Sequence, residues 1–190
     1  MDLFSAIKGR RSCRKFLQDP IGEETIEQIL EAAIWAPSPV NNQPWEFIVI
    51  TNADIKKRIH EESVQFKQVL VEKSGWKWLG VYKPGFLMEA PVIIAVVGDP
   101  NKGGADMFVE GEGTSYMKAC SAAIQNMLLA AHALGLGSLW FTLYDKDPLR
   151  KILNIGLDKD PAGLIIIGKA AGAPLQTPRK EIKEKTRYLR

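Results

Sequence analysis

The sequence contains very few of the residues that usually build disulfides, metal centres or nucleophilic triads. Its two cysteines are Cys13, which lies in a polar segment, and Cys120, which lies in an apolar one, so no disulfide framework is indicated. Its two histidines, His60 and His132, have no metal-ligand spacing to each other or to the cysteines, so a structural zinc site is not expected. Neither histidine stands in a motif that would suit a Ser-His-Asp triad. Any chemistry of this chain is therefore expected to belong to a cofactor.

The N-terminal segment also lacks an apolar run of signal-peptide length, and an acidic residue, Asp2, stands close to its start. We expect a cytoplasmic protein on this basis. The longest uncharged stretch, 119–144, would place Gln125 and the Gly-Leu-Gly break at 135–137 at membrane depth, so it predicts a buried helix followed by a strand. With 190 residues and 46% hydrophobic content, the chain is long enough for one domain with a substantial core.

Positive charge is concentrated near the two ends of the chain. The net charge is +3, but residues 8–15 carry +5 and residues 179–190 carry +4, which leaves −6 for the rest. Basic clusters often bind polyanions, yet these two contain no interleaved aromatic residues, and the acidic remainder would repel a phosphate backbone. We therefore expect no nucleic-acid partner, and we expect the basic residues to serve a smaller anion.

The hydrophobic periodicity predicts an α+β chain without internal repeats. Helices are expected near residues 2–9, 23–35, 52–70, 114–134 and 145–154, and strands near 45–51, 91–97, 138–143 and 162–168. The strand at 45–51 is expected to be buried on both faces. The helix at 114–134 has almost no polar face, which indicates burial against a second subunit as well as against the sheet. The tail, residues 172–190, is expected to cross that subunit.

Two stretches stand out because they combine polar side chains with a restricted backbone. The first is Arg-Arg-Ser-Cys-Arg at 10–14, which follows a helix stop; if it is extended, Arg10, Ser12 and Arg14 face the same way. The second is Ala-Pro-Ser-Pro-Val-Asn-Asn-Gln-Pro-Trp at 36–45, in which three prolines fix φ and leave amide and hydroxyl groups free to bind something else.

Taken together, these motifs resemble the nitroreductase family of FMN-dependent oxidoreductases. That family has an Arg-Arg-Ser-x-Arg-x-Phe segment followed by Ala-Pro-Ser-x-x-Asn-x-Gln-Pro-Trp, and both occur here in order. Two later features also match. The first is the end of a helix followed by Gly-Leu-Gly-Ser, at 125–138. The second is a Gly-x-Pro with a downstream Pro-Arg, at 172–179. The resemblance spans essentially the whole chain.

The resemblance implies a central, mainly antiparallel sheet flanked by helices, in an intertwined homodimer that holds FMN at two interfacial sites. In this family the first motif binds the phosphate and pyrimidine edge of FMN, and the Pro-rich loop approaches the flavin of the other subunit. Backbone amides near the end of a late strand face flavin N5 and O4, and a C-terminal arginine closes on the phosphate. The implied cofactor-binding residues are Arg10, Arg11, Ser12, Arg14, Pro37, Ser38, Pro39, Asn41, Trp140, Phe141, Thr142 and Arg179.

The family's chemistry further implies NAD(P)H as co-substrate and a ping-pong mechanism, with hydride passing to flavin N5 and electrons then passing to a nitroaromatic, quinone or enone acceptor. No catalytic side chain and no metal are implied, because backbone near Phe141 and Thr142 serves the flavin edge. Alternatives are other flavin chemistry on the same fold, such as reductive dehalogenation or breakdown of the flavin, or a flavin-binding protein without turnover.

Residues 71–88 form an aromatic, glycine-rich segment that we expect to be irregular. One interpretation is a satellite hydrophobic cluster that holds down a long loop. The other is a lid over the flavin face, in which Trp76, Trp78 and Phe86 select a small planar acceptor by stacking. The sequence of this segment is consistent with both the satellite cluster and the lid.

Overall fold

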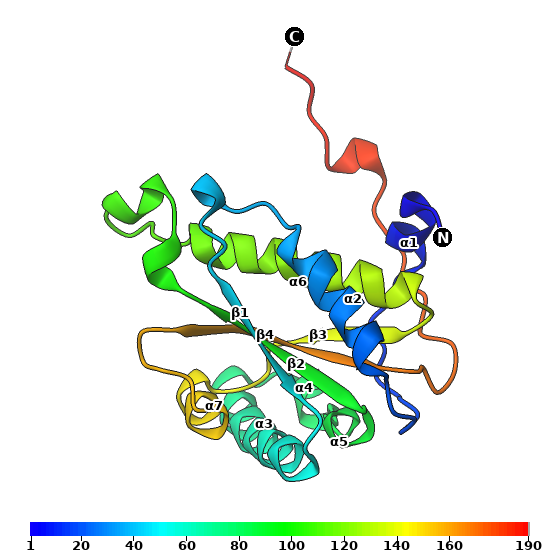
Figure 1. Ribbon diagram of the computed structural model, residues 1–190. Helices are drawn as coiled ribbons and strands as arrows, with labels where there is room; N and C mark the ends of the chain where they lie inside the picture. The colour runs from blue at the N-terminus through cyan, green and yellow to red at the C-terminus, as the bar shows by residue number, and fades with distance from the viewer. Residues whose placement is uncertain (190) are drawn as a thin grey trace.

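The computed structural model describes residues 1–189, and Figure 1 shows its helices and strands. The helices are α1 (Leu3–Gly9), α2 (Glu23–Ile34), α3 (Ala53–Ser74), α4 (Lys77–Val81), α5 (Phe86–Glu89), α6 (Ser115–Ala133) and α7 (Lys146–Leu153). The strands are β1 (Trp45–Ile50), β2 (Val92–Gly98), β3 (Gly137–Phe141) and β4 (Asp160–Gly168). Short 3-10 helices lie in the connections, at η1 (Pro39–Asn41), η2 (Pro100–Lys102) and η3 (Ala105–Phe108), and in the C-terminal tail, at η4 (Ile182–Glu184).

The strands form one sheet in the order β1-β2-β4-β3, and each neighbouring pair is antiparallel. Every residue of β2 and β4 is buried, as their continuous apolar runs indicate. β1 differs from expectation, because Glu46 is exposed and Val49 is 40% exposed. The prediction that this strand is buried on both faces is wrong: β1 lies at the edge of the sheet, and the helices centre on β2 and β4 instead.

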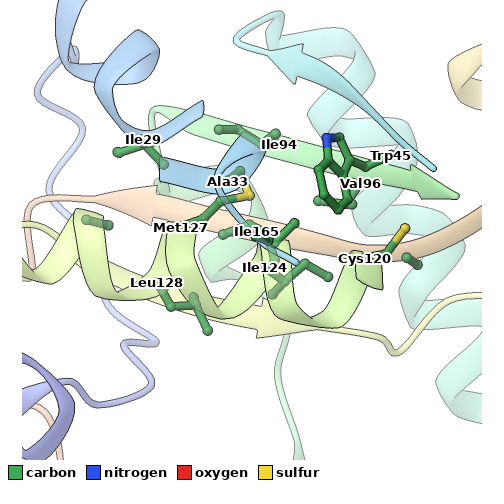
Figure 2. Packing of buried hydrophobic residues seen from close by; sticks show 14 of the residues in the cluster. Ile29, Ala33, Trp45, Ile94, Val96, Cys120, Ile124, Met127, Leu128 and Ile165 are labelled. Carbon is green, nitrogen blue, oxygen red and sulfur yellow. The ribbon is translucent and has the colours of Figure 1, made fainter. Parts of the chain in front are cut away.

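Two helical layers cover the two faces of this sheet (Figure 1). Because successive strand residues point to opposite faces, Ile94 and Ile165 pack toward α2 and α6, as Figure 2 shows, while their neighbours pack toward α3, α5 and α7. Met127 of α6 is fully buried in the first core. The apolar stretch 119–144 is thus a buried helix followed by a strand, as predicted. Among residues 1–189, no helix combines the length and apolar character that a membrane crossing requires.

Local signals in the sequence account for both ends of α3. The Asn52 side chain accepts N–H bonds from Asp54 and Ile55 at 2.9 and 3.0 Å, which caps the start of α3. α3 continues to Ser74 and ends at Gly75, whose φ of 66° is the left-handed conformation common at helix ends. The segment expected to be irregular is therefore partly helical, because α4 and α5 follow this sharp turn.

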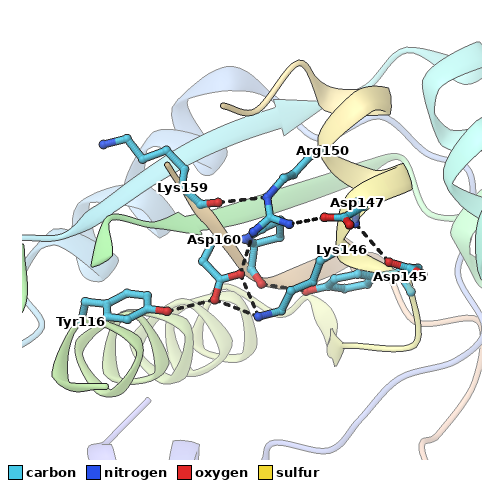
Figure 3. A network of polar contacts seen from close by, with 9 residues as sticks. Tyr116, Asp145, Lys146, Asp147, Arg150, Lys159 and Asp160 are labelled. Atoms are coloured by element: carbon cyan, nitrogen blue, oxygen red, sulfur yellow. Dashed lines mark hydrogen bonds and ion pairs between the residues drawn. The ribbon is translucent and has the colours of Figure 1, made fainter. Parts of the chain in front are cut away.

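A buried carboxylate anchors the start of β4 to both helical layers (Figure 3). Asp160 accepts from the Tyr116 hydroxyl of α6 at 3.0 Å and pairs with Lys146 and Arg150 of α7 at 2.7 and 3.2 Å. Burial first, and then the bond to Asp160, raise the pKa of Tyr116 to about 12. The bonds of Asp160 run to side chains of α6 and α7, so this cluster joins three secondary structure elements.

The two ends of the chain lie outside the packed layers. Every residue from 171 to 189 is exposed, and the tail extends away from the body (Figure 1). The apolar side chains of α1 are also uncovered, with Leu3, Phe4 and Ile7 exposed by 62%, 69% and 48%. Apolar surface of this extent is uncommon on a monomer.

Candidate functional site

Residues 10–14, here called the arm, leave α1 in an extended conformation and are fixed to the sheet. The Cys13 N–H donates to the Ser138 carbonyl at 2.9 Å, at the start of β3. Phe16 forms an antiparallel bridge with Ala170, just beyond β4. The arm is therefore clamped between the ends of two strands, so the sheet determines where its side chains lie.

A cavity of about 200 Å³ opens between the arm and the tail, and four guanidinium groups line it. Its lining residues are Arg10, Arg11, Ser12, Arg14, Leu175, Thr177 and Arg179. Burial first, and then repulsion from Arg11 and Arg179, lower the pKa of Arg10 below its ordinary value. Within residues 1–189 no ion pair involves any of these arginines. This cationic cavity accumulates positive charge without a carboxylate to offset it, which suits an anionic group.

Two other cavities adjoin the arm. The larger, of about 520 Å³, shares Ser12, Arg14 and Leu175 with the cationic cavity and is otherwise lined mainly by small and apolar residues. The other, of about 250 Å³, lies behind the arm and is lined by Arg11 and Ser138, whose Nε and Oγ atoms are buried without a partner among the described residues. Buried polar atoms left unpaired by the chain itself indicate room for bound atoms beyond the protein. No group of three or more His, Cys, Asp or Glu in the described part of the chain is placed to hold a metal ion.

The Pro-rich loop, residues 37–43, is ordered but strained. The Ser38 Oγ accepts from the N–H of Gln43 at 3.0 Å. Val40 and Asn41 have φ values of 43° and 57°, in the left-handed region, which is unfavourable for a β-branched residue. The side chain of Val40 is 83% exposed, so no packing within this chain accounts for the strain. A strained, outward-facing loop of this kind indicates a contact beyond the chain.

The Pro-rich loop and the arm lie at opposite ends of α6 (Figure 1). A cavity beside Pro37 and Pro39 is lined by Ala119, in the first half of the helix, whereas the cavity behind the arm is lined by His132, near its end. Thirteen residues separate these two helix positions, which corresponds to about 20 Å along the axis. Within one chain, the structure does not bring the two motifs together.

The predicted flavin-edge residues lie at the end of β3, which is an edge strand of the sheet. Phe141 is buried in the core that faces α3, whereas Thr142 lies just beyond the strand and is exposed. Trp140 is 36% exposed, and its indole nitrogen occupies the space where a side chain at Gly163 would lie. Gly163 is thus needed for the position of Trp140, and periodicity alone did not reveal this requirement.

The aromatic segment forms a continuous series of ring contacts from the surface to β3. Ring centroids are 5.7 Å apart for Trp76 and Trp78, 6.1 Å for Trp78 and Tyr82, and 6.2 Å for Tyr82 and Phe86. Phe86 then meets Phe141 at 5.5 Å. The two tryptophans are 58% and 57% exposed, but Phe86 is only 2% exposed. Phe86 therefore supports the segment from below, whereas the two tryptophans are its most exposed rings.

The sequence pattern of the nitroreductase family matches residues 7–169. The chain belongs to the nitroreductase family. A relative from Methanothermobacter thermautotrophicus, provisionally named NADH dehydrogenase/NAD(P)H nitroreductase, is 34% identical over 92% of this chain and 80% of its own length. An iodotyrosine deiodinase of Hydra vulgaris is 28% identical over 91% of this chain and 65% of its own length. A provisionally named nitroreductase of Desulfovibrio desulfuricans, solved in complex with FMN, matches all of this chain and 98% of its own with a TM-score of 0.76 and 27% identity.

These matches confirm the predicted α+β nitroreductase fold. For this member of the nitroreductase family, sequence reasoning missed Thr177 and Leu175, which line the cationic cavity. The Arg179 Nη1 donates to the Thr177 Oγ1 at 2.8 Å, so the threonine orients the guanidinium. A hydroxyl residue two positions before the arginine was an available signal, but only the path of the tail places it beside the arm.

Proposed function

We propose that this chain binds FMN and passes electrons from NAD(P)H to a small planar acceptor, with nitroaromatics, quinones and conjugated enones as the acceptor classes. The observation that carries the proposal is the cationic cavity, in which arginines of the arm and the tail converge without a carboxylate. Membership of the nitroreductase family and the FMN complex of the Desulfovibrio relative support the same cofactor. We also infer a single domain over residues 1–190, since both cores pack against one sheet.

The residues present fit FMN. Arg10, Arg14 and Arg179 can form charge-assisted bonds to a phosphate, and the hydroxyl of Ser12 adds a further polar contact. The adjoining cavity of about 520 Å³ combines small and apolar lining residues with the arm, which suits a large ring joined to that phosphate. Arg11 Nε offers an additional donor that no atom of residues 1–189 uses.

We infer that the complete site needs two copies of the chain. The Pro-rich loop is about 20 Å along α6 from the arm, so in our proposal Pro37, Ser38, Pro39 and Asn41 act at the flavin of a partner. In a two-fold dimer, the loop end of one α6 can meet the arm end of the other, and the reverse contact follows by symmetry. The exposed face of α1 and the fully exposed tail support such a dimer, because both leave apolar surface for a partner to cover.

Bound FMN supplies the two-electron chemistry, and the chain supplies binding, orientation and shielding. We assign the backbone amides near Trp140, Phe141 and Thr142 to orienting the reactive edge of the ring. The ladder between β3 and β4 holds this backbone in place, which is the preorganisation that such contacts need. Trp76 and Trp78 are proposed to lie against planar substrates. In this proposal NAD(P)H and the acceptor use one exposed face in turn, and protons come from solvent.

The decisive experiment is anaerobic reduction of the purified protein. We expect a yellow protein that bleaches near 450 nm when NADH or NADPH is added and regains colour with an acceptor. A yellow protein that neither nicotinamide reduces would favour a flavin-binding role without turnover. A colourless protein that cannot be reconstituted with FMN would refute the proposal.

A second candidate is different flavin chemistry at the same site, and the Hydra relative named iodotyrosine deiodinase favours it. We place it second because the Methanothermobacter relative has higher identity and covers more of its own length. Anaerobic incubation of the reduced protein with an iodinated phenol separates the two candidates. Release of iodide at a rate above that of nitroaromatic reduction would reverse their order.

A further inference from the structure

The connection from β3 to α7, residues 142–145, is fastened to α3 by a buried carboxyl group. The Oε1 of Glu62 accepts the backbone N–H of Asp145 at 2.7 Å, although 83 positions separate the two residues. Glu62 is buried, so water does not compete for this bond. Asp145 is also the N-cap of α7, since its side chain accepts the N–H of Asp147 at 3.1 Å (Figure 3). Glu62 therefore determines where the connection ends and α7 begins.

The connection is short and is held at both of its ends. It starts directly after Phe141, which pairs with Leu164 in the ladder between β3 and β4. Within it, Tyr144 is buried and its hydroxyl donates to a backbone carbonyl of β4 at 3.4 Å, whereas Thr142 is exposed. Only two residues lie between Thr142 and Asp145. A shift of Asp145 is therefore carried to Thr142, because so short a span of chain has little slack.

Glu62 carries a polar atom that the fold does not use. Its Oε2 is buried without a partner among residues 1–189, and no ion pair of the described residues involves its carboxyl group. Burying an unpaired polar atom lowers stability, and an apolar side chain of the same length would fill the space without that cost. Departures of this kind are expected mainly at functional sites. The carboxyl group is therefore better explained by its bond to Asp145 than by packing.

We propose that Glu62 is a positioning residue for the flavin site, which holds the backbone near Phe141 and Thr142 in place through its bond to the connection. The inference rests on the proposed function, since that assigns these backbone amides to the reactive edge of the ring. Glu62 acts from beneath the connection and contacts the flavin through no atom of its own. Backbone donors serve such an edge only when they are held in position beforehand, and a displacement of about 1 Å can slow a reaction about a hundredfold.

The groups around Glu62 make its ionisation a convenient label for this bond. Burial raises the pKa of Glu62 to about 7; the Asp145 N–H bond opposes the rise, and the Asp145 charge adds to it. The Tyr144 phenol also faces it, because burial first, and then the charges of Asp160 and Glu62, raise the pKa of Tyr144. Other charged side chains of α3, α5 and α7 bond to other groups, namely Lys56, Glu89, Lys146, Asp147 and Arg150. The lysines Lys77 of α4 and Lys151 of α7 are exposed.

The first test compares Glu62→Met, Glu62→Gln and the control Glu61→Met, which changes the exposed neighbour on α3. Methionine has about the length of glutamate without a strong acceptor, whereas glutamine keeps the acceptor oxygen. The FMN-loaded proteins are reduced anaerobically with saturating NADH or NADPH at about pH 6, below the pKa of Glu62, where glutamine resembles the protonated side chain. Glu62→Met should lower the reduction rate about tenfold without changing the affinity for FMN or for the nicotinamide.

The conservative variant and the control decide what the loss means. Glu62→Gln should reduce its flavin within about twofold of the wild-type rate, and Glu61→Met should match the wild type. A wild-type rate in Glu62→Met would overturn the inference. So would a Glu62→Gln variant as slow as Glu62→Met, because the acceptor oxygen would then not be what matters.

The second test follows the bond itself and stays decisive even if Glu62→Met does not fold. In NMR spectra of the FMN-loaded wild type, the amide signals of Asp145 and Thr142 should both shift with a midpoint near pH 7, and in Glu62→Gln neither should. A titration seen at Asp145 but absent at Thr142 would show that the bond does not position the flavin-edge backbone, and would overturn this inference alone. Wild-type protein that cannot be loaded with FMN would overturn the proposed function, and this inference with it.

Discussion

Glu62 of α3 is buried beneath the connection from β3 to α7, and its ionisation should control stability near neutral pH. The residue is 7% exposed; its Oε1 accepts the Asp145 N–H at 2.7 Å, and its Oε2 has no partner in the part of the chain that the structure describes. Burial raises the pKa of Glu62 to about 7, and the charge of Asp145 adds to the rise, while the N–H bond acts in the opposite direction. The hydroxyl of Tyr144, whose pKa burial also raises, lies in the same region.

The direction in which stability changes with pH follows from how many protons the folded and unfolded chains bind. Between pH 4.5, the ordinary pKa of a glutamate, and about pH 7, the folded chain keeps a proton that the unfolded chain has lost. Stability from this group is therefore fully present below pH 4.5, is lost progressively up to pH 7, and is constant above it. Each pKa unit corresponds to about 1.4 kcal/mol of free energy. The difference between the folded and unfolded pKa of Glu62 therefore changes the free energy of unfolding by at most about 3 kcal/mol. Relaxation around the carboxylate lowers this to about 2 kcal/mol.

Glu62→Gln tests the reasoning, because glutamine keeps the oxygen that accepts from Asp145 but cannot ionise. Its new amide group adds a cost that does not vary with pH. Urea unfolding at fixed protein concentration should show that the wild type loses about 2 kcal/mol relative to the variant between pH 4.5 and pH 8. If the difference in unfolding free energy between the wild type and the variant stays constant over this pH range, Glu62 is not a buried group that ionises there.

Three further changes test the flavin site and the dimer. Arg10→Ala should weaken FMN binding by about 1.5–3 kcal/mol in a fluorescence titration, because a charge-assisted bond is lost. The control is Arg58→Ala, which changes an arginine on the exposed surface of α3. Equal FMN affinities of the two variants would contradict the assignment of Arg10. Trp78→Ala should alter relative kcat/KM values among planar acceptors while FMN stays bound, and unchanged values would leave α4 a packing role only. Deleting residues 178–190 should lower both flavin content and Tm, and the wild-type Tm should rise with protein concentration. An FMN-loaded wild-type monomer at sub-micromolar concentration in sedimentation would contradict the shared site.

The sequence alone was sufficient for the features that depend on neighbours along the chain. The apolar runs of β2 and β4 and the helical period of α2 and α6 each act within a few residues, so these elements were predicted with small errors at their ends. The ordered motifs in the arm and the Pro-rich loop likewise led to the correct family. Charge along the chain further predicts that both basic ends serve an anion, and this stays a prediction.

Tertiary structure alone decided which of these residues meet. The burial of β1 depended on its place at the edge of the sheet, and the burial of Phe86 depended on its contact with Phe141; neither is a property of local periodicity. The tail brings Thr177 and Arg179 to the arm across a long stretch of sequence, whereas α6 keeps the Pro-rich loop away from it. Such contacts are set by chain topology and the balance of many weak interactions, which a one-dimensional pattern does not contain.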